Sequence, residues 1–468
     1  MDAGATAFFS TVNMVKTIVG AGMLAVPYAF KSDGILVGTA LTIVGAVTSG
    51  FGLFVLAKCS KTLINPRASS FFTLCSITYP SLSLIFDFAM FVQCYGVGLS
   101  YLVLVGDLFP GVVGGTRRGW IIGSTLATVP LSLIKRLDGL KYSSILGLFA
   151  VAYLVCLILG SFLKDVVLSE NYREFRGDVS WIGVYDKKGL VSTFTIIVFA
   201  FTASMNLFSI INELKDNSMQ NINKVITSSI STSAALFLSV GVCGYLTFGS
   251  NVVGNIMLNY DPESIWTTIG KLCLGTMVIL SFPLLLHPCR IAANNMMHWI
   301  LLTYGKCEVH HEARNKHKHP TSPITMVIED EEDRLLLGSE GNYEATVNGP
   351  SYQEVEENRE DSLTEVVPFP NQRFYIITAV LVISLYVLAL NVSSFALVLA
   401  LVGATGSTAI SFTLPGLFGY KLIGSQAARN GQLMSRSDKF LKSCSLALAI
   451  YGLAVMFLSL YVTIKYGA

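Results

Sequence analysis

Long apolar stretches recur along this chain, and they constrain its fold more than any other feature of the sequence. Eleven of them approach the length that crosses a bilayer, since roughly 20 apolar residues in a helix span about 30 Å of hydrocarbon. They lie near residues 6–30, 34–57, 82–106, 119–134, 143–163, 190–212, 225–248, 265–289, 374–391, 393–417 and 444–464. Because hydrocarbon offers backbone N–H and C=O groups no hydrogen-bond partner, each span must be a helix. The sequence therefore predicts an all-α polytopic membrane protein with eleven transmembrane helices.

The composition agrees with this class and argues against others. Hydrophobic residues make up 52% of the chain and charged residues 13%, about half the charged share of a typical soluble domain. A net charge of +2 gives no reason to expect a nucleic-acid partner. No phosphate-binding glycine loop or plausible catalytic triad occurs, so we expect neither an enzyme nor an ATP-driven pump, and no cofactor. Four of the six histidines lie in HHEARNKHKH (310–319), whose spacing fits a solvated loop better than a zinc site.

The distribution of Lys and Arg predicts the orientation in the membrane. With a cytosolic N-terminus, thirteen basic residues fall in short cytosolic loops and nine on the opposite side, five of these in the 164–189 loop where acids nearly balance them. This bias favours a cytosolic N-terminus and a C-terminus on the luminal side. The polar segment 304–370 is then cytosolic, and its richness in Glu, Asp, Asn, Ser and Pro predicts disorder.

Two spans contain residues that interrupt a helix. The first carries Gly20, Gly22 and Pro27 near its middle, within NMVKTIVGAGMLAVPYAF (13–30), and these residues loosen or break a helix. The sixth contains FAFTASMNLFSIINEL (199–214), where Thr202, Ser204 and Asn206 are polar in mid-span. Paired interruptions at matching positions of two halves are typical of inverted-repeat transporters, whose site lies at the membrane midplane.

The first break predicts a site for an amino-acid zwitterion. Its second half exposes the N–H groups of Ala21, Gly22 and Met23, which favour a carboxylate. The first half ends in the carbonyls of Thr17 and Ile18, which favour an ammonium group. We therefore expect the substrate at residues of both interrupted spans: Thr17, Ile18, Gly20, Ala21, Gly22, Thr202, Ser204 and Asn206. The alternative is a kinked packing helix, because glycines also permit close helix contacts.

Four segments resemble one family of membrane proteins. VNMVKTIVGAGMLAVPYAF (12–30) is similar to the first helix of the amino acid/auxin permease family, and DFAMFVQCYGVGLSYLVLVGDLFP (87–110) resembles its third. FSIINEL (208–214) and FPLLLHPCR (282–290) resemble the sixth and eighth helices of the fungal vacuolar amino-acid transporters, the AVT group. The sodium-coupled neutral amino-acid transporters are more distant relatives.

The resemblance implies a five-plus-five inverted repeat of the leucine-transporter type with one extra helix. The first repeat would comprise 1–163, followed by the non-cytosolic loop 164–189. The second would comprise 190–419, interrupted by the disordered loop 304–370. Residues 420–468 would form a cytosolic linker and the eleventh helix.

The resemblance also implies proton-coupled export of amino acids to the cytosol across the vacuolar membrane. Two departures bear on this expectation. Ala203-Ser204 stands where many relatives carry Cys-His, and Lys16 stands where the sodium-coupled branch has an asparagine that binds the ion. The alternatives are a sodium-coupled symporter of the plasma membrane and an amino-acid sensor that does not transport.

Three residues are candidates for ion coupling: Lys16, Ser281 and Asp87. Lys16 would place an ammonium where sodium sits in sodium-coupled relatives, between the first and eighth helices, with Ser281 as a neighbour. A desolvated lysine can also lose and regain a proton, which would make protons the coupling ion. The alternative is that Lys16 snorkels to the membrane surface. Asp87 would pair with Lys16 or relay protons, or would reach interfacial water from a helix end.

The polar segment 304–370 contains short sorting patterns. Glu331 with Leu335 and Leu336 fits the acidic dileucine pattern that clathrin-type adaptors read, and Tyr352-Gln-Glu-Val355 fits the tyrosine type. Such patterns are common by chance, so a loop without an adaptor partner is the alternative.

Overall fold

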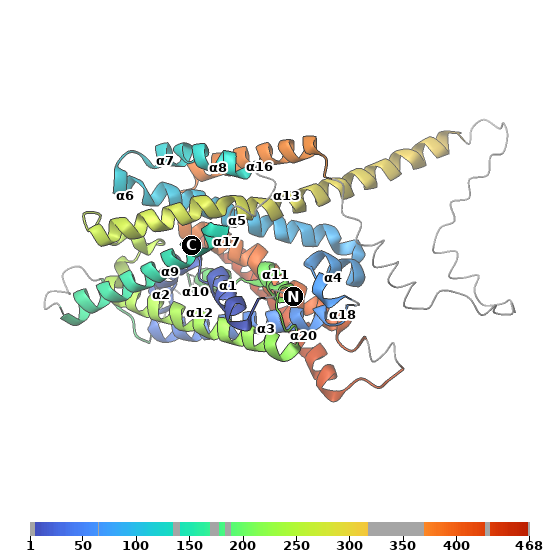
Figure 1. Cartoon of the computed structure of the whole chain (residues 1–468), viewed down its shortest axis with the longest axis horizontal. Helices are drawn as coiled ribbons and strands as arrows, with labels where there is room; N and C mark the ends of the chain where they lie inside the picture. Colours follow the sequence, from blue (N-terminus) through green and yellow to red (C-terminus); the bar gives the residue numbers. More distant parts are fainter. Residues whose placement is uncertain are drawn as a thin grey trace. The chain divides into compact units, whose positions relative to one another are not determined.

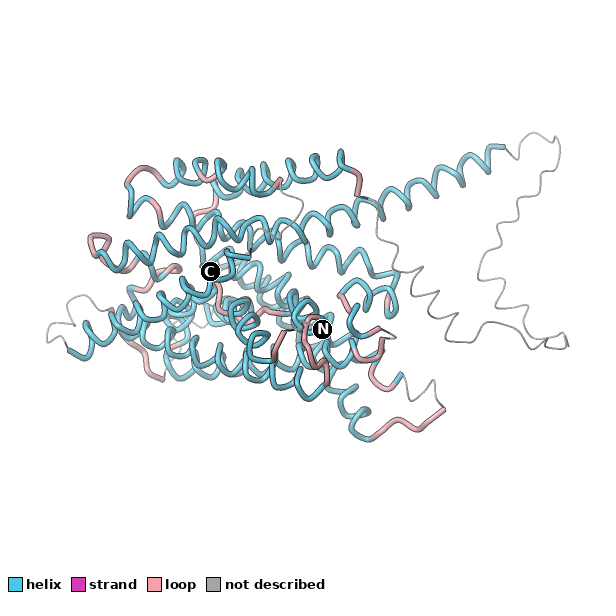
Figure 2. Tube along the Cα trace, in the orientation of Figure 1, coloured by secondary structure: helices cyan, strands magenta, loops and turns pink. Residues whose placement is uncertain are grey.

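The described structure is helical throughout. It is a computed structural model that describes residues 5–63, 65–133, 141–168, 177–182, 189–316, 369–425 and 431–466. Figures 1 and 2 show helices joined by short loops, and the described residues contain no strand beyond an isolated bridge between Ala5 and Leu214. The chain divides into two compact units: Met1–Asn295 with Phe369–Ala468, and Met296–Pro368. The all-α prediction is confirmed.

Nine helical segments of the described chain are long and apolar enough to cross a membrane. They are Ile35–Ser60, Ser83–Val113, Leu146–Leu168, Gly189–Asn212, Met219–Asn251, Ile265–Leu301, Asn371–Asn391, Phe395–Leu422 and Arg436–Lys465. A tenth is formed by Ala7–Ile18 together with Ala21–Asp33, a pair of helices bent by 46°. Each of these segments coincides with one of the predicted spans.

The predicted span 119–134 has a different form. It contains two short helices, α7 (Arg117–Gly123) and α8 (Thr125–Ser132), and residues beyond 133 lie outside the described part. At the interruption, the Ser124 hydroxyl donates to the Ile121 carbonyl at 2.7 Å, a local bond that competes with regular helix geometry. Neither helix is long enough to count as a span, so the total of eleven stays a prediction.

Different backbone hydrogen bonds join the chain segments at the two ends of the larger unit. At one end, Ala5 donates to the Glu213 carbonyl at 2.8 Å and accepts from the Lys215 N–H at 2.9 Å. At the other, the N–H groups of Ile35 and Leu36 donate to the carbonyls of Ser180 and Trp181 at 3.1 and 3.0 Å. We call the end that contains Ala5 the N-terminal end. It also contains the residues before α4 (Phe71–Thr78), since Asn212 exchanges hydrogen bonds with Ser69.

The smaller unit is described only over its first part. The helix α13 (Ile265–Lys316) runs from the larger unit as far as Lys316, so it continues past 304, where the predicted disordered loop begins. Residues 317–368 lie outside the described part, and they include Glu331, Leu335 and Leu336 of the sorting pattern.

Glycines allow helices of the larger unit to approach backbone to backbone. A Cβ on Gly52, in α3 (Ile35–Ser60), would collide with the carbonyl oxygen of Ser411, which lies in the turn η10 (Ala409–Thr413). Backbone atoms cannot move aside as a flexible side chain can.

Gly52→Ala is therefore expected to destabilise the protein by about 1–3 kcal/mol, the usual range for overpacking. Gly50→Ala on the same helix is the matched control, because its Cβ would meet Ile230 at an ordinary 3.6 Å. Thermal unfolding of the detergent-solubilised variants measures the difference. Equal melting temperatures for the two variants would contradict the close contact between α3 and η10.

Candidate functional site

The two interrupted spans meet at their breaks. Helix α1 (Ala7–Ile18) is followed by the 3₁₀ turn η1 (Ala21–Ala25), and α10 (Gly189–Ala200) is followed after three residues by α11 (Ser204–Asn212). Gly22 lies against the end of α10: a Cβ on it would be only 3.1 Å from the Cα of Ala200 and 3.2 Å from the Phe199 ring. The absence of a side chain at Gly22 lets η1 pack directly on α10.

At the first break, backbone N–H donors and backbone carbonyl acceptors lack hydrogen-bond partners in the described structure. Within the described chain, the N–H groups of Ala21 and Gly22 make no hydrogen bond, and the carbonyls of Lys16 and Thr17 accept none. Two expected groups are occupied instead. The Met23 N–H donates to the Gly20 carbonyl at 3.2 Å, and the Ile18 carbonyl accepts from the Gly20 N–H at 2.9 Å. The chain folds tightly back on itself at Gly20, which pairs these groups locally.

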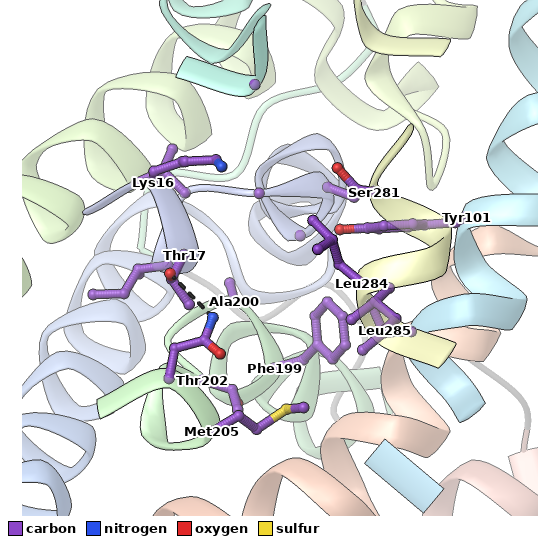
Figure 3. A pocket seen from close by; sticks show the side chains of 18 of the residues that line it. Lys16, Thr17, Tyr101, Phe199, Ala200, Thr202, Met205, Ser281, Leu284 and Leu285 are labelled. Atoms are coloured by element: carbon purple, nitrogen blue, oxygen red, sulfur yellow. Dashed lines mark hydrogen bonds between the residues drawn. The ribbon is translucent and has the colours of Figure 1, made fainter. Parts of the chain in front are cut away.

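A cavity of about 230 Å³ lies at this break. Helices α5 (Ser83–Leu108) and α9 (Lys141–Phe162) line it together with α1, η1, the α10–α11 segment and α13. Its lining residues are Lys16, Thr17, Ile18, Val19, Gly20, Ala21, Gly22, Gln93, Val97, Tyr101, Gly147, Val151, Phe199, Ala200, Thr202, Met205, Asn206, Met277, Ser281, Leu284, Leu285 and Pro288. Figure 3 shows side chains of the interrupted spans on one side and of α13 on the other. We call it the central cavity.

Most of the predicted site residues line the central cavity. They are Lys16, Thr17, Ile18, Gly20, Ala21, Gly22, Thr202, Asn206 and Ser281. The Asn206 amide donates to the Thr17 hydroxyl at 3.3 Å, which joins the two interrupted spans directly (Figure 3). Ser204 is not among the lining residues, and its side chain is buried. The Thr202 hydroxyl donates to the Val198 carbonyl at 2.9 Å, which satisfies one acceptor that the break of α10 releases.

Lys16 reaches the central cavity without a neutralising partner. Among the described residues it has no ion pair, and its stem lies against α9, where a Cβ on Gly147 would be 3.1 Å from the Lys16 Cε. Ser281 lines the same cavity from α13, on the side opposite Lys16 (Figure 3). An ionised side chain within a span costs roughly 2.5–3.5 kcal/mol on insertion scales, so its position calls for a functional explanation.

Asp87 lies elsewhere, so the expected pair between Lys16 and Asp87 does not form. Asp87 accepts a hydrogen bond from the Asn295 amide at 3.2 Å and lines a second cavity of about 400 Å³. The reason is its position along α5. Gln93, which lines the central cavity, comes six residues later, and six residues correspond to about 9 Å of helix.

Two polar residues of the spans take positions that the sequence interpretation missed. Gln93 lines the central cavity and its side-chain oxygen accepts from the Ser407 hydroxyl at 2.8 Å. Arg290 is 1% exposed, donates to the Ser132 carbonyl at 2.6 Å and lies 4.5 Å from the Phe374 ring centre. Arg290 is therefore buried among protein groups. For Gln93 the available signal was a polar side chain in the middle of a predicted span, whereas Arg290 follows the end of the predicted span 265–289 and had no such signal.

Comparisons with known proteins agree with this geometry. A family model described as transmembrane amino acid transporter protein matches residues 3–458, and the chain belongs to this family. It is 57% identical to the vacuolar amino acid transporter 7 of Saccharomyces cerevisiae, over 99% of each chain. It is 36% identical to the vacuolar amino acid transporter 5 of the same yeast, over 97% of each. A more distant match is the sodium-coupled neutral amino acid transporter 7 of Danio rerio, at 25% identity over 59% of this chain and 61% of the relative.

Asn206→Ala should weaken amino-acid binding about five-fold, because it removes one side-chain hydrogen bond of about 1 kcal/mol beside the first break. Ser204→Ala is the matched control on the same helix, since Ser204 lies outside the central cavity. Competition between labelled and unlabelled amino acids on the purified variants gives the affinities. Equal affinities for Asn206→Ala and the parent protein would mean that Asn206 only packs.

Proposed function

We propose that this protein is a secondary active transporter that exports amino acids from the vacuole to the cytosol, coupled to protons. The observation that carries the proposal is the central cavity, where a broken helix presents free N–H groups and free carbonyls within one membrane span. Membership of the amino acid transporter family supports the cargo, and similarity to the vacuolar amino acid transporters 7 and 5 of yeast supports both the cargo and the membrane.

The substrate carboxylate would bind the N–H groups of Ala21 and Gly22. A helix N-terminus favours an anion by about 0.3–1 kcal/mol, and by up to ~2 kcal/mol when partly buried. The ammonium group would face the carbonyls of Lys16 and Thr17, which end α1 and carry its partial negative charge. A zwitterion thus replaces the water that these backbone groups would otherwise need. The hydroxyl of Thr17 and the amide of Asn206 border the same space.

The pairing of the two breaks supports a five-plus-five inverted repeat with α20 (Arg436–Tyr466) as the extra helix. The first and sixth predicted spans are the ones that break, and they pack on each other where they do so. In such transporters the substrate lies between two repeats that rock about it. The Lys and Arg bias supports a cytosolic N-terminus, and the N-terminal end of the larger unit would then face the cytosol.

Lys16 supplies the proposed coupling. Its ammonium and the Ser281 hydroxyl line the central cavity from opposite sides, and sodium-coupled relatives are expected to hold their ion between the two helices that carry them. Two cations about 4 Å apart repel by ~4 kcal/mol at an effective dielectric constant near 20. That repulsion lowers sodium affinity by roughly three orders of magnitude. Proton release and uptake by Lys16 would take the place of sodium binding.

Amino-acid transport is therefore expected to proceed without sodium and to depend on a pH gradient. Uptake of labelled L-leucine, L-glutamine, L-tyrosine, L-lysine and L-glutamate into proteoliposomes, each at clamped pH with and without sodium, measures both properties. Lys16→Ala should weaken the pH dependence, and Lys16→Asn should allow sodium to stimulate transport. A sodium requirement of the unmodified protein would refute this mechanism and favour a plasma-membrane symporter.

Gly22→Val should abolish transport and leave the protein folded in the membrane. The valine side chain would separate η1 from Ala200, because even its Cβ meets α10 at 3.1 Å, and the free N–H groups would move with η1. Gly160→Val in α9 is the matched control, since a Cβ there meets nothing within 4 Å. The same uptake assay is used for both variants. Near-parental uptake by Gly22→Val would contradict carboxylate binding at this turn.

A further inference from the structure

The second cavity adjoins the central cavity and extends toward the N-terminal end. The two cavities share Met205 and Pro288 in their walls. From there the second cavity runs between α4, α5, α11 and α13 to Ser69 and Ser70, which precede α4. Its volume of about 400 Å³ is larger than that of the central cavity. We call it the vestibule, because it lies between the central cavity and one end of the helix bundle.

Asp87 is the one charged side chain among the residues that line the vestibule. No cation of the described chain lies within ion-pair distance of it. One of its oxygens accepts the hydrogen bond from Asn295, and its second oxygen has no protein donor in the described structure. An unpaired carboxylate in a cavity with low-dielectric walls attracts cations strongly, because few water molecules screen it.

The remaining walls of the vestibule are largely apolar and are held in place. Phe71 and Phe208 meet edge to face with their ring centres 5.1 Å apart. Asn212 fixes the end of α11 to the loop before α4, as it donates to the Ser69 carbonyl at 2.9 Å and accepts from the Ser69 hydroxyl at 2.8 Å. The vestibule is therefore preformed, as small-molecule sites usually are.

We propose that the vestibule is a second amino-acid subsite, in which Asp87 binds the ammonium group of the cargo and the aromatic wall contacts its side chain. This inference rests on the proposed transport function. A single carboxylate beside apolar surface fits an alkylammonium group, which carries its charge at one end. The cargo would rest there between the central cavity and the N-terminal end, and would pass Met205 and Pro288 on the way. Amino acids with a net negative charge would be held less well.

If the vestibule is a subsite, Asp87 contributes to the affinity for an amino acid that enters from the N-terminal end. In proteoliposomes, counterflow of the amino acid that the parent transports best gives the KM from that end. Asp87→Asn should raise this KM about ten-fold and leave kcat nearly unchanged, and Asp87→Glu should restore part of the affinity. Glu213→Gln is the matched control, because Glu213 is an exposed carboxylate of the same end that lies outside both cavities. A KM unchanged in Asp87→Asn, or raised equally in Glu213→Gln, would overturn the subsite.

A binding measurement separates this inference from the transport proposal. n-Propylammonium carries the predicted group without a carboxylate, and propionate of similar size carries the opposite charge. Millimolar n-propylammonium should raise the melting temperature of the purified parent protein, and propionate should not. An equal response to both probes, or none, would overturn the subsite even if the parent transports. If the parent shows no uptake of any amino acid but n-propylammonium still stabilises it selectively, then the transport proposal fails and the ammonium site stands.

Discussion

Unpaired backbone groups inside a membrane are the constraint on which this structure depends. Each such group costs several kcal/mol in hydrocarbon, so a helix can break there only where protein or a polar cavity receives the freed groups. At the break of α1, the Met23 N–H and the Ile18 carbonyl are paired locally through Gly20, and the N–H groups of Ala21 and Gly22 border the central cavity. The break of α1 therefore depends on the central cavity, which its free N–H groups border, and on the glycine contact, which lets η1 pack on α10. A zwitterion, with one carboxylate and one ammonium group, would supply partners for both kinds of free group.

The separation of Lys16 from Asp87 gives the two cavities different characters. Lys16 makes the central cavity cationic and Asp87 makes the vestibule anionic, since the two do not pair and line different cavities. If they had formed an ion pair, both cavities would have lost their charge and a cargo would have found no electrostatic distinction between them. An amino acid that is exported toward the N-terminal end would first be held by its carboxylate at the break and then by its ammonium group in the vestibule. This order follows because Asp87 lies nearer the N-terminal end than the central cavity does.

Hydropathy and helix-breaking residues predicted the spans and the two breaks, because both signals are local in sequence. The relative positions of polar residues were harder to predict. Asn206 lines the cavity, whereas Ser204, two residues earlier in α11, is buried away from it, as a rotation of about 100° per residue would place it. Pairing with Lys16 was one of the expectations for Asp87, but Asp87 lies too far along α5 to reach it. The two residues line different cavities. The interruption between α7 and α8 depends on the Ser124 hydroxyl bond, and the burial of Arg290 depends on partners far away in sequence. The contacts of Arg290 and the position of Asp87 relative to Lys16 cannot be predicted from a single segment of the sequence.

The central claim is that an amino acid binds at the break of α1 with its carboxylate on the free N–H groups. A cryo-electron microscopy map of the protein in lipid nanodiscs, with a saturating concentration of the amino acid it transports best, tests this directly. The account predicts density for the ligand in the central cavity, with its carboxylate within hydrogen-bond distance of the Ala21 and Gly22 nitrogens. A ligand bound in some other part of the protein, with these two nitrogens facing only water or protein, would contradict it.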